Sequence, residues 1–380
     1  MPTEVLIQNV SSQCIPNLVA AETFQPKRMI WVYTDESQNT LQQLQQSTQH
    51  ITNQQEIWHV QARDSELMQQ RLKACFAALS LQGKLVFHLT CGTKGMALQG
   101  LMQLAMYKQK HGADVSAVVM NPKTQQFDML FPQAGNAIQA CAQLRFKHIL
   151  AVHGSERHKH SGRDMQRLKK YDAPLSALRN LHKPMMQAMQ GRTVCSIDES
   201  ADKGFYLRGG HDLPKVVQQG LALAQDCGAI QHLHMTNTHF SFQSQACDNP
   251  IAYIRNTWME DWVGAVLAKH DDGQWHGGYS SVKVSIKTAD DYQEFDFLGA
   301  RKNHLVYWSC KNMNEVKTPQ LFEIDALRDE VGGRDFHVAG LLHTAVIKQG
   351  LHIKAKRLGL KTLQVTVPDA EERLLAMSCL

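Results

Sequence analysis

A chain of 380 residues is too long for one ordinary hydrophobic core, so we expect two or three domains. Hydrophobic residues make up 43% and charged residues 20% of the chain, and no apolar run is as long as a membrane span. This composition predicts a globular protein and excludes a membrane-spanning one. The net charge of +5 permits a polyanionic partner without requiring one.

The amino-terminal residues and the cysteines bear on the cellular compartment. The first ten residues, MPTEVLIQNV, lack a basic region followed by an apolar core, so we expect no signal peptide. The nine cysteines are an odd number and include no Cys-x-x-Cys pair, which favours reduced thiols over a disulfide framework or a zinc site. Together these features predict a cytoplasmic protein.

The first 135 residues alternate between strand and helix patterns. An alternating βα order predicts an open, mostly parallel sheet. We expect residues 136–150 to be helical and to end this domain. The expected strands are 4–9, 28–33, 84–89 and 115–120, and the expected helices include 41–50, 65–82 and 96–111.

Two loops of this sheet are candidate ligand sites, because ligands bind beyond the carboxyl ends of parallel strands. They are residues 11–17 and 90–95. The second loop bears glycines and leads into a helix, whose amino-terminal N–H groups favour a phosphate, and Lys94 adds a cation. It matches neither a Walker loop nor a dinucleotide fingerprint. A tight strand-to-helix turn explains it equally well.

The middle of the chain, residues 151–249, has weaker patterns. We expect helices near 175–189 and 213–229 and short strands near 232–242, which indicate a small connecting module of winged-helix type. If this module binds DNA, the protein could instead be a transcriptional regulator. Such a regulator would bind duplex DNA with a steep salt dependence.

From residue 250 the pattern is sharper, and it predicts a domain over 250–380. An amphipathic helix at 251–269 precedes a strand at 282–287, the two-stranded stretch 294–311, a helix near 320–331 and a strand at 336–341. The order is therefore helix, three strands, helix, strand.

The stretch 294–311, EFDFLGARKNHLVYWSCK, holds the residues most suited to chemistry. Side chains alternate along a strand, so Ser309 and Lys311 point the same way, and Asp296 on the neighbouring strand could meet them. A carboxylate beside a lysine at paired strands is typical of metal-dependent nucleases. For an isolated Asp–Lys pair a surface ion pair is the better explanation, but the order of elements favours a nuclease.

If this group of residues catalyses metal-assisted phosphodiester hydrolysis, each residue has an expected role. Asp296 binds the metal directly, with the backbone carbonyl of Cys310 as a second ligand. Glu260, on the preceding helix, reaches the same site as a direct or water-mediated ligand. Lys311 positions the attacking water or stabilises the developing charge, and Glu294 shares a face with Asp296 and can supply a further carboxylate.

The carboxyl-terminal part resembles a known family. The stretches at 257–263 (TWMEDWV), 294–311 and 327–341 (LRDEVGGRDFHVAGL) are similar to the CARF-fused ancillary nucleases of type III CRISPR systems. Their nuclease domain has the PD-(D/E)xK restriction-endonuclease fold, with an acid on one strand and (D/E)-x-K on the next. Here that signature reads Asp296, then Ser309-Cys310-Lys311.

The amino-terminal part resembles the CARF domain, a Rossmann-like sensor of cyclic oligoadenylates, in residues 10–21 (VSSQCIPNLVAA) and 89–100 (LTCGTKGMALQG). The resemblance implies an α/β protein with a CARF domain at 1–150, a connecting module at 151–249 and a restriction-endonuclease-like domain at 250–380. The ligand contacts that it implies are Ser11, Ser12, Gln13, Asn17, Thr34, Thr90, Gly92, Thr93 and Lys94.

The resemblance also implies partners and a cofactor. We expect a homodimer that binds one cyclic oligoadenylate, cyclic tetra-adenylate in the first instance, and then cuts DNA or RNA with Mn²⁺ or Mg²⁺. The departure is Ser309, where the family has an acid, because a serine hydroxyl is a poor ligand for a divalent metal beside a carboxylate. The alternative is a sensor that binds cyclic oligoadenylate and nucleic acid without cutting.

Overall fold

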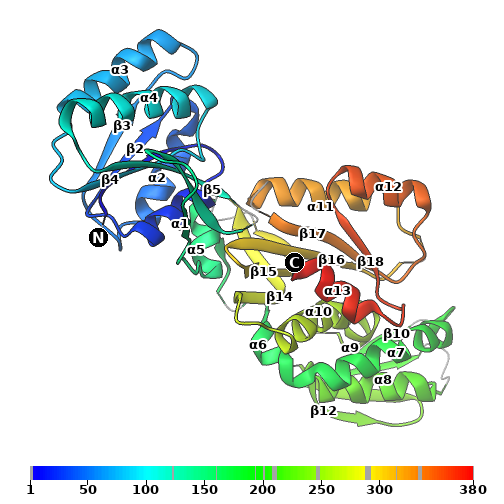
Figure 1. Cartoon of the computed structure of the whole chain (residues 1–380). Coiled ribbons are helices and arrows are strands. Elements are labelled where there is room, and N and C mark those ends of the chain that lie inside the picture. The colour runs from blue at the N-terminus through cyan, green and yellow to red at the C-terminus, as the bar shows by residue number, and fades with distance from the viewer. Residues whose placement is uncertain are drawn as a thin grey trace. The chain divides into compact units, whose positions relative to one another are not determined.

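The chain folds into two compact units, each shown in the computed structural model (Figure 1). Unit 1 comprises residues 1–156 together with 302–304, and unit 2 comprises residues 157–301 and 305–380. The structure describes residues 3–379 apart from 122–123, 160, 193, 200–201, 208–211, 245–248, 287–291, 314 and 333–335.

A seven-stranded sheet forms the centre of unit 1, in the order β3-β2-β1-β4-β5-β6-β7. Strands β1 to β5 pair in parallel, and β6 and β7 extend the sheet by antiparallel pairing. The expected open, mostly parallel α/β sheet is therefore confirmed. The strands are β1 (Thr3–Asn9), β2 (Arg28–Tyr33), β3 (Gln55–His59), β4 (Lys84–His88), β5 (Val115–Asn121), β6 (Gln126–Phe131) and β7 (Ala137–Gln139).

Helices cover both faces of this sheet. Figure 1 shows α3 and α4 together on one face, and α1, α2 and α5 on the other. Asp64 caps α3 by accepting hydrogen bonds from the backbone N–H groups of Glu66 and Leu67, at 3.1 and 2.9 Å. The helices are α1 (Ile15–Phe24), α2 (Gln38–Ser47), α3 (Ser65–Ala78), α4 (Lys94–His111) and α5 (Phe146–Val152).

Two parts of unit 1 differ from the sequence expectation. Residues 136–150 were expected to be helical, but they contain β7, and α5 begins only at Phe146. A three-residue strand such as β7 depends on its pairing with β6, which periodicity along the chain does not reveal. Strand β3 was not expected either, because its sequence QEIWH is polar and partly exposed.

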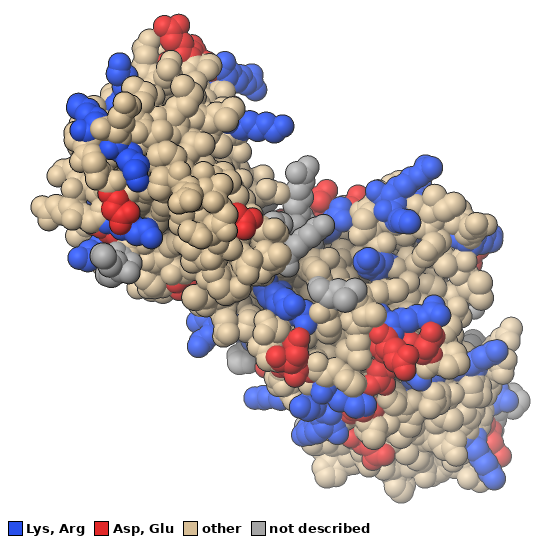
Figure 2. Space-filling view, in the orientation of Figure 1, with Lys and Arg blue, Asp and Glu red and all other residues tan. Residues whose placement is uncertain are grey.

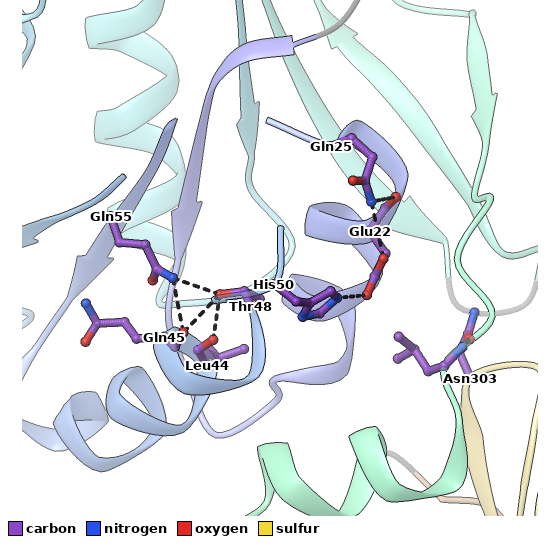
Figure 3. A network of polar contacts seen from close by, with 9 residues as sticks. Glu22, Gln25, Leu44, Gln45, Thr48, His50, Gln55 and Asn303 are labelled. Carbon is purple, nitrogen blue, oxygen red and sulfur yellow. Dashed lines mark hydrogen bonds and ion pairs between the residues drawn. The ribbon is translucent and has the colours of Figure 1, made fainter. Parts of the chain in front are cut away.

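Helix α2, rich in glutamine, is held by buried leucines and by polar contacts around its carboxyl end (Figure 3). Leu41 and Leu44 are its buried residues. Gln55 donates to the backbone carbonyl of Gln45 at 3.1 Å, and His50 lies 2.7 Å from a carboxylate oxygen of Glu22 on α1. Gln55 of β3 and the His50–Glu22 contact therefore fasten the carboxyl end of α2 to its neighbours.

Unit 2 contains most of a second large sheet, in the order β18-β17-β16-β15-β14-β8, with β9 also paired to β14. The expected order of helix, three strands, helix and strand is confirmed by α10, β14, β15, β16, α11 and β17. The elements are α10 (Trp258–Lys269), β14 (Trp275–Ile286), β15 (Tyr292–Arg301), β16 (His304–Lys311), α11 (Thr318–Val331), β17 (Phe336–His343), α12 (Gln349–Arg357), β18 (Lys361–Gln364) and α13 (Ala370–Ser378).

Helix α10 lies at the centre of the unit 2 core. Nearly all its residues are buried, and it packs against α6, α7 and β14. The sequence predicted one continuous helix over 251–269, whereas a π-helical segment, η3 (Tyr253–Thr257), separates α10 from the short α9 (Pro250–Ala252). In the described part of the chain, no helix has the length and apolar character that crossing a membrane requires.

Residues 157–249 lie within unit 2 rather than in a compact unit of their own. They share one apolar core with α10, through the buried faces of α7 and α8. The division of the chain into three domains stays a prediction. The elements of this segment and the residues just before it are β8 (Ser155–Arg157), β9 (Arg163–Asp164), α6 (Met165–Leu168), η2 (Lys169–Tyr171), α7 (Asp172–Met189), α8 (Lys215–Asp226) and a four-stranded antiparallel sheet of β10 (Val194–Glu199), β11 (Asp202–Leu207), β13 (His239–Ser244) and β12 (Ile230–Met235).

Asn303 provides a test of the fold of unit 1. This residue is buried and has φ of 65°. It accepts a hydrogen bond from the Leu144 N–H at 2.8 Å and donates to Gln125 and to the Ala142 carbonyl at 3.1 Å. We expect Asn303→Ala to lower the free energy of unfolding by about 2 kcal/mol, because it leaves a buried N–H unpaired and strains the left-handed backbone. Thermal unfolding and hydrogen exchange of the Leu144 amide measure this.

The matched control is Asn303→Gly, which keeps the left-handed conformation at little cost and removes only the hydrogen bonds. It should lose less stability than the alanine variant. Equal unfolding temperatures for Asn303→Ala and the wild type would contradict the role assigned to this residue.

Candidate active site

Asp296 and Lys311 lie next to each other on the neighbouring strands β15 and β16. Lys311 Nζ is 3.6 Å from Asp296 Oδ2. The same oxygen accepts a hydrogen bond from the backbone N–H of Cys310 at 2.6 Å and another from the hydroxyl of Ser309 at 3.1 Å. These contacts all fall on Oδ2, so they hold the carboxylate from one side. The structure thus brings together the residues of the expected signature.

Ser309 supports Asp296 rather than adding an acid to the site. Its side chain is only 1% exposed, and its hydroxyl donates to Asp296. With a hydroxyl at this position, the site has one negative charge fewer than it would have with a glutamate. It also binds a divalent cation more weakly than a carboxylate does.

Glu260 faces the same site from the first turn of α10. The hydroxyl of Ser281, on β14, donates a hydrogen bond to Glu260 Oε2. Burial raises the pKa of Glu260 well above its ordinary value, and the charge of Asp296 raises it further. Ser281 has φ of 48°, in the left-handed region that non-glycine residues rarely occupy. The backbone of β14 is therefore strained where it holds Glu260.

Lys311 keeps its positive charge despite its partly buried position. Burial pulls the pKa of Lys311 down, but the carboxylates of Asp296 and Glu323 outweigh burial and hold the pKa above its ordinary value. Glu323 Oε1, on α11, lies 4.0 Å from the ammonium nitrogen. The cation is therefore available to interact with an anionic group at this site.

Glu294 lies at the rim of the site. It is exposed, precedes Asp296 by two residues on β15, and pairs across the strands with Lys283. Its charge contributes to raising the pKa of Glu260, but less than the charge of Asp296 does. The structure therefore places Glu294 near the candidate catalytic group without burying it there.

The oxygen atoms of this site suit a hard divalent cation such as Mg²⁺ or Mn²⁺. Over the described ranges, no group of three or more His, Cys, Asp or Glu side chains is arranged to hold a metal ion by itself. The protein would supply the carboxylates of Asp296 and Glu260 and the backbone carbonyl of Cys310. Mg²⁺ is commonly bound by one or two carboxylates, with waters and substrate phosphate completing its shell. The donor set fits such an ion, with one acid fewer than the full signature.

The residue after Glu260 belongs to a buried network that the sequence did not predict. Asp261 is fully buried, and its carboxylate accepts hydrogen bonds from Ser280 at 2.5 Å, from the Tyr253 hydroxyl at 2.8 Å, and from the Arg163 guanidinium. Two adjacent acids of α10 therefore bond to two adjacent serines of β14. The sequence shows only that two adjacent acids and two adjacent serines are present. It does not reveal which acid bonds to which serine.

In unit 1, the two loops predicted to bind a ligand lie side by side beyond the carboxyl ends of β1 and β4. The Cys91 thiol donates to the backbone carbonyl of Gln13 at 3.0 Å. Gly92 has φ of 83°, and a Cβ there would lie 2.7 Å from the Cβ of Asn9, so only glycine fits. Thr93 caps α4 by accepting a backbone N–H bond at 3.2 Å. The amino-terminal N–H groups of α4 open at this edge.

Two of the predicted ligand contacts, Asn17 and Thr34, are buried, and a third, Thr90, is partly buried and bonded inward. Asn17 is fully buried and donates its hydrogen bonds to β1, and Thr34 is 6% exposed. The Thr90 hydroxyl accepts from the backbone N–H of Met120 at 2.6 Å and lies 2.8 Å from His88 Nε2. Burial lowers the pKa of His88 to about 3, so its neutral ring can accept the hydroxyl proton. The other predicted contacts are partly or fully exposed: Ser11, Ser12, Gln13, Gly92, Thr93 and Lys94.

Comparison with known proteins identifies the fold of the amino-terminal part of the chain. Residues 5–147 match the family model described as the Card1 CARF domain. The chain carries a CARF domain. The predicted resemblance to CARF-domain ancillary nucleases is therefore confirmed for the amino-terminal part of the chain. No curated protein matches the chain at a significant level.

Solved structures share the fold of the chain beyond the CARF domain. Protein VC1899 from Vibrio cholerae is 14% identical, with a TM-score of 0.72, and the match covers 98% of this chain and 96% of that one. Can2 from Sulfobacillus thermosulfidooxidans, solved in complex with cyclic tetra-adenylate, is 15% identical over the same shares, with a TM-score of 0.68. A type III CRISPR defence DNA nuclease activated by cyclic oligoadenylate is 14% identical, with a TM-score of 0.52, over 99% of this chain and 52% of that one. The TM-scores and the coverage of this chain establish a common fold.

The raised pKa of Glu260 leads to a prediction about pH. A group whose folded-state pKa is raised contributes stability at low pH, and that contribution is lost as the pH rises through the folded pKa. In metal-free buffer we therefore expect the unfolding temperature of the wild type to fall relative to that of Glu260→Gln between about pH 5 and about pH 8. Calorimetry at both pH values measures the difference.

Glu294→Gln is the matched control, because it removes an exposed carboxylate from the rim of the same site. We expect its unfolding temperature to follow the wild type across this range. If Glu260→Gln also follows the wild type, the pKa of Glu260 is not raised in the folded protein.

Proposed function

We propose that the protein is a metal-dependent nuclease that a cyclic oligoadenylate activates in type III CRISPR defence. Its CARF domain and a fold shared with Can2 over nearly the whole chain support this function. A further structure with this fold is a DNA nuclease activated by cyclic oligoadenylate. The observation that carries the proposal is the 3.6 Å contact between Asp296 and Lys311, with Glu260 beside it.

Each residue of the site has a distinct task in this reaction. A bound divalent ion would supply Lewis acidity and a water of lowered pKa. Asp296, Glu260 and the carbonyl of Cys310 would hold it. The hydrogen bonds from Ser309 and Cys310 fall on Asp296 Oδ2, so Oδ1 stays outside them and can face the ion. Lys311 remains charged and stabilises the negative charge that develops on the phosphate.

The ligand binds in this proposal at the edge formed by the two loops of unit 1. Lys94 and the amino-terminal N–H groups of α4 contact its phosphates, and Ser11, Ser12, Gln13 and Thr93 supply further polar contacts. A cyclic ligand with repeated units, cyclic tetra-adenylate in the first instance, suits a two-fold homodimer that presents this edge twice. Residues 1–150 then form the sensor and residues 250–380 the nuclease, joined by 151–249. The protein works in the cytoplasm on DNA or RNA.

Ser309 favours a second candidate function. A site with a serine in place of an acid binds a metal less well, so the protein could act as a sensor that holds cyclic oligoadenylate and nucleic acid without cutting. The buried position of this serine and its bond to Asp296 are the specific observations in favour of that alternative.

An activation assay tests the proposed function directly. We expect purified protein with Mn²⁺ and cyclic tetra-adenylate to cleave single- or double-stranded nucleic acid. Lys311→Ala should lower the cleavage rate at least about 100-fold, because it removes the cation that stabilises developing charge. Lys361→Ala, an exposed lysine on the same sheet, is the control and should cleave like the wild type. Identical rates for Lys311→Ala and the wild type under every condition would refute the catalytic assignment.

Ser309→Glu separates the two candidate functions in the same assay. If the protein is a working nuclease, the wild type cleaves and the glutamate variant changes its metal requirement. Cleavage by Ser309→Glu alone, with none by the wild type, would instead assign the protein to the sensors that no longer cut.

Ligand binding by unit 1 forms a separate prediction. We expect Lys94→Ala to weaken the affinity for cyclic tetra-adenylate about tenfold, because one cation–phosphate contact is lost. Isothermal titration calorimetry measures the affinity, and Lys110→Ala, at the other end of α4, is the matched control. An unchanged affinity would show that the ligand does not contact this loop. The absence of binding by the wild type would refute the sensing role altogether.

A further inference from the structure

Phe322 is an aromatic side chain of α11 that lies on the surface beside the candidate active site. It is 50% exposed, whereas its neighbours Leu321 and Ile324 are buried. The next residue, Glu323, reaches Lys311 at 4.0 Å. Single exposed rings are common on protein surfaces, so the groups around this ring decide what it can bind.

Helices α11 and α12 lie side by side and run in the same direction (Figure 1). Lys354 of α12 places its ammonium nitrogen 4.4 Å from the centre of the Phe322 ring, and further along both helices Arg328 donates to the Leu358 carbonyl at 3.0 Å. The two helices follow β16 and β17, which pair in parallel, so both begin at the edge of the sheet where β16 ends in Lys311. Phe322 therefore lies one turn from the end of α11 that is nearest Lys311, with Lys354 against it.

Helix α12 carries positive charge without negative charge. Lys354, Lys356 and Arg357 lie in its last turn, and in the described part of the chain none of them forms an ion pair. Three acidic residues of α11 are, by contrast, paired with Lys311 or Arg328. Figure 2 shows Lys and Arg side chains where Figure 1 places α12. Cations that no acid neutralises therefore lie next to the exposed ring, which favours an anionic partner that also has a flat group.

We propose that Phe322 stacks on an unpaired base of a nucleic-acid strand and that Lys354 and Arg357 contact the phosphates beside that base. Every base has a π face, so an aromatic ring can bind a strand with little regard to its sequence, while lysine and arginine side chains bind its backbone. Lys354 and Arg357 are one turn apart on α12, so their side chains lie on one face of the helix. This inference rests on the proposed function, because it names a substrate contact for the nuclease outside the metal site.

The contact would hold a strand close to Lys311 without taking part in the reaction. A base inside a duplex is already stacked on both sides, and taking it out of the stack costs a few kcal/mol. Phe322 therefore binds a base that is already unpaired much more readily than one in a duplex. The surface favours single-stranded DNA or RNA, a choice that the residues around Asp296 do not make by themselves.

Equilibrium binding in metal-free buffer tests this surface separately from cleavage. The probe is a fluorescently labelled single-stranded DNA of about 20 nucleotides, titrated with the full chain and cyclic tetra-adenylate at several salt concentrations. We expect Phe322→Leu to weaken binding about tenfold with an unchanged salt slope, because the stacked ring is lost but no charge is. Phe322→Trp should bind at least as tightly as the wild type.

The charged residues have a different signature in the same titration. Lys354→Gln should reduce the slope of log affinity against log salt by about 0.7, because one phosphate contact is lost. Lys183→Gln, which removes an exposed lysine from α7, is the matched control and should keep the affinity and the slope of the wild type.

Two further probes separate the base from the phosphates. An abasic strand of the same length, and the same sequence as a duplex, should each bind the wild type and Phe322→Leu with equal affinity. An equal loss on the abasic strand would show that the ring does not act by stacking. Equal binding of the intact single strand by the wild type and Phe322→Leu, or no binding by the wild type, would overturn the proposal.

These outcomes do not depend on cutting. Weaker binding by Phe322→Leu in a protein that never cleaves would support the strand contact and refute the nuclease. A protein that cleaves, but binds the single strand equally well without the ring, would refute the strand contact alone.

Discussion

The repulsion between Glu260 and Asp296 is the constraint on which the candidate active site depends. Burial raises the pKa of Glu260, and the charge of Asp296 raises it further, so these two carboxylates favour a proton or a cation between them. The neighbouring groups all limit the repulsion. Ser281 and Ser309 donate hydrogen bonds to the acids, and Lys311 places a positive charge beside Asp296.

Helix α10 sets the distance between the two acids, because it carries one of them against the sheet that carries the other. Asp261, the residue after Glu260 on this helix, bonds to Arg163, Tyr253 and Ser280 and has no role at the candidate site. That buried network fixes the first turn of α10 against β14. A buried charge with several partners is costly to disturb, so it holds the helix more rigidly than apolar contacts alone would.

The parts that could be predicted from the sequence are those with a local signal. Alternation along β15 and β16 was sufficient to place Asp296 and Lys311 on one face, and the βα order was sufficient for the sheet of unit 1. The partners of Asp261 and the left-handed conformation of Ser281 depend on residues far apart in the chain. Hydrophobic periodicity carries no information on such pairs. The three-residue strand β7 was missed for the same reason.

The candidate ligand edge of unit 1 is held in place by residues that face inward. Thr90 ties its loop to Met120 on β5 and to the neutral His88, and Cys91 ties it to Gln13 in the other loop. The inner side of each loop is therefore bonded before any ligand arrives. A ligand that contacts only the exposed outer side meets a surface already in place, which lowers the entropy that binding would otherwise cost.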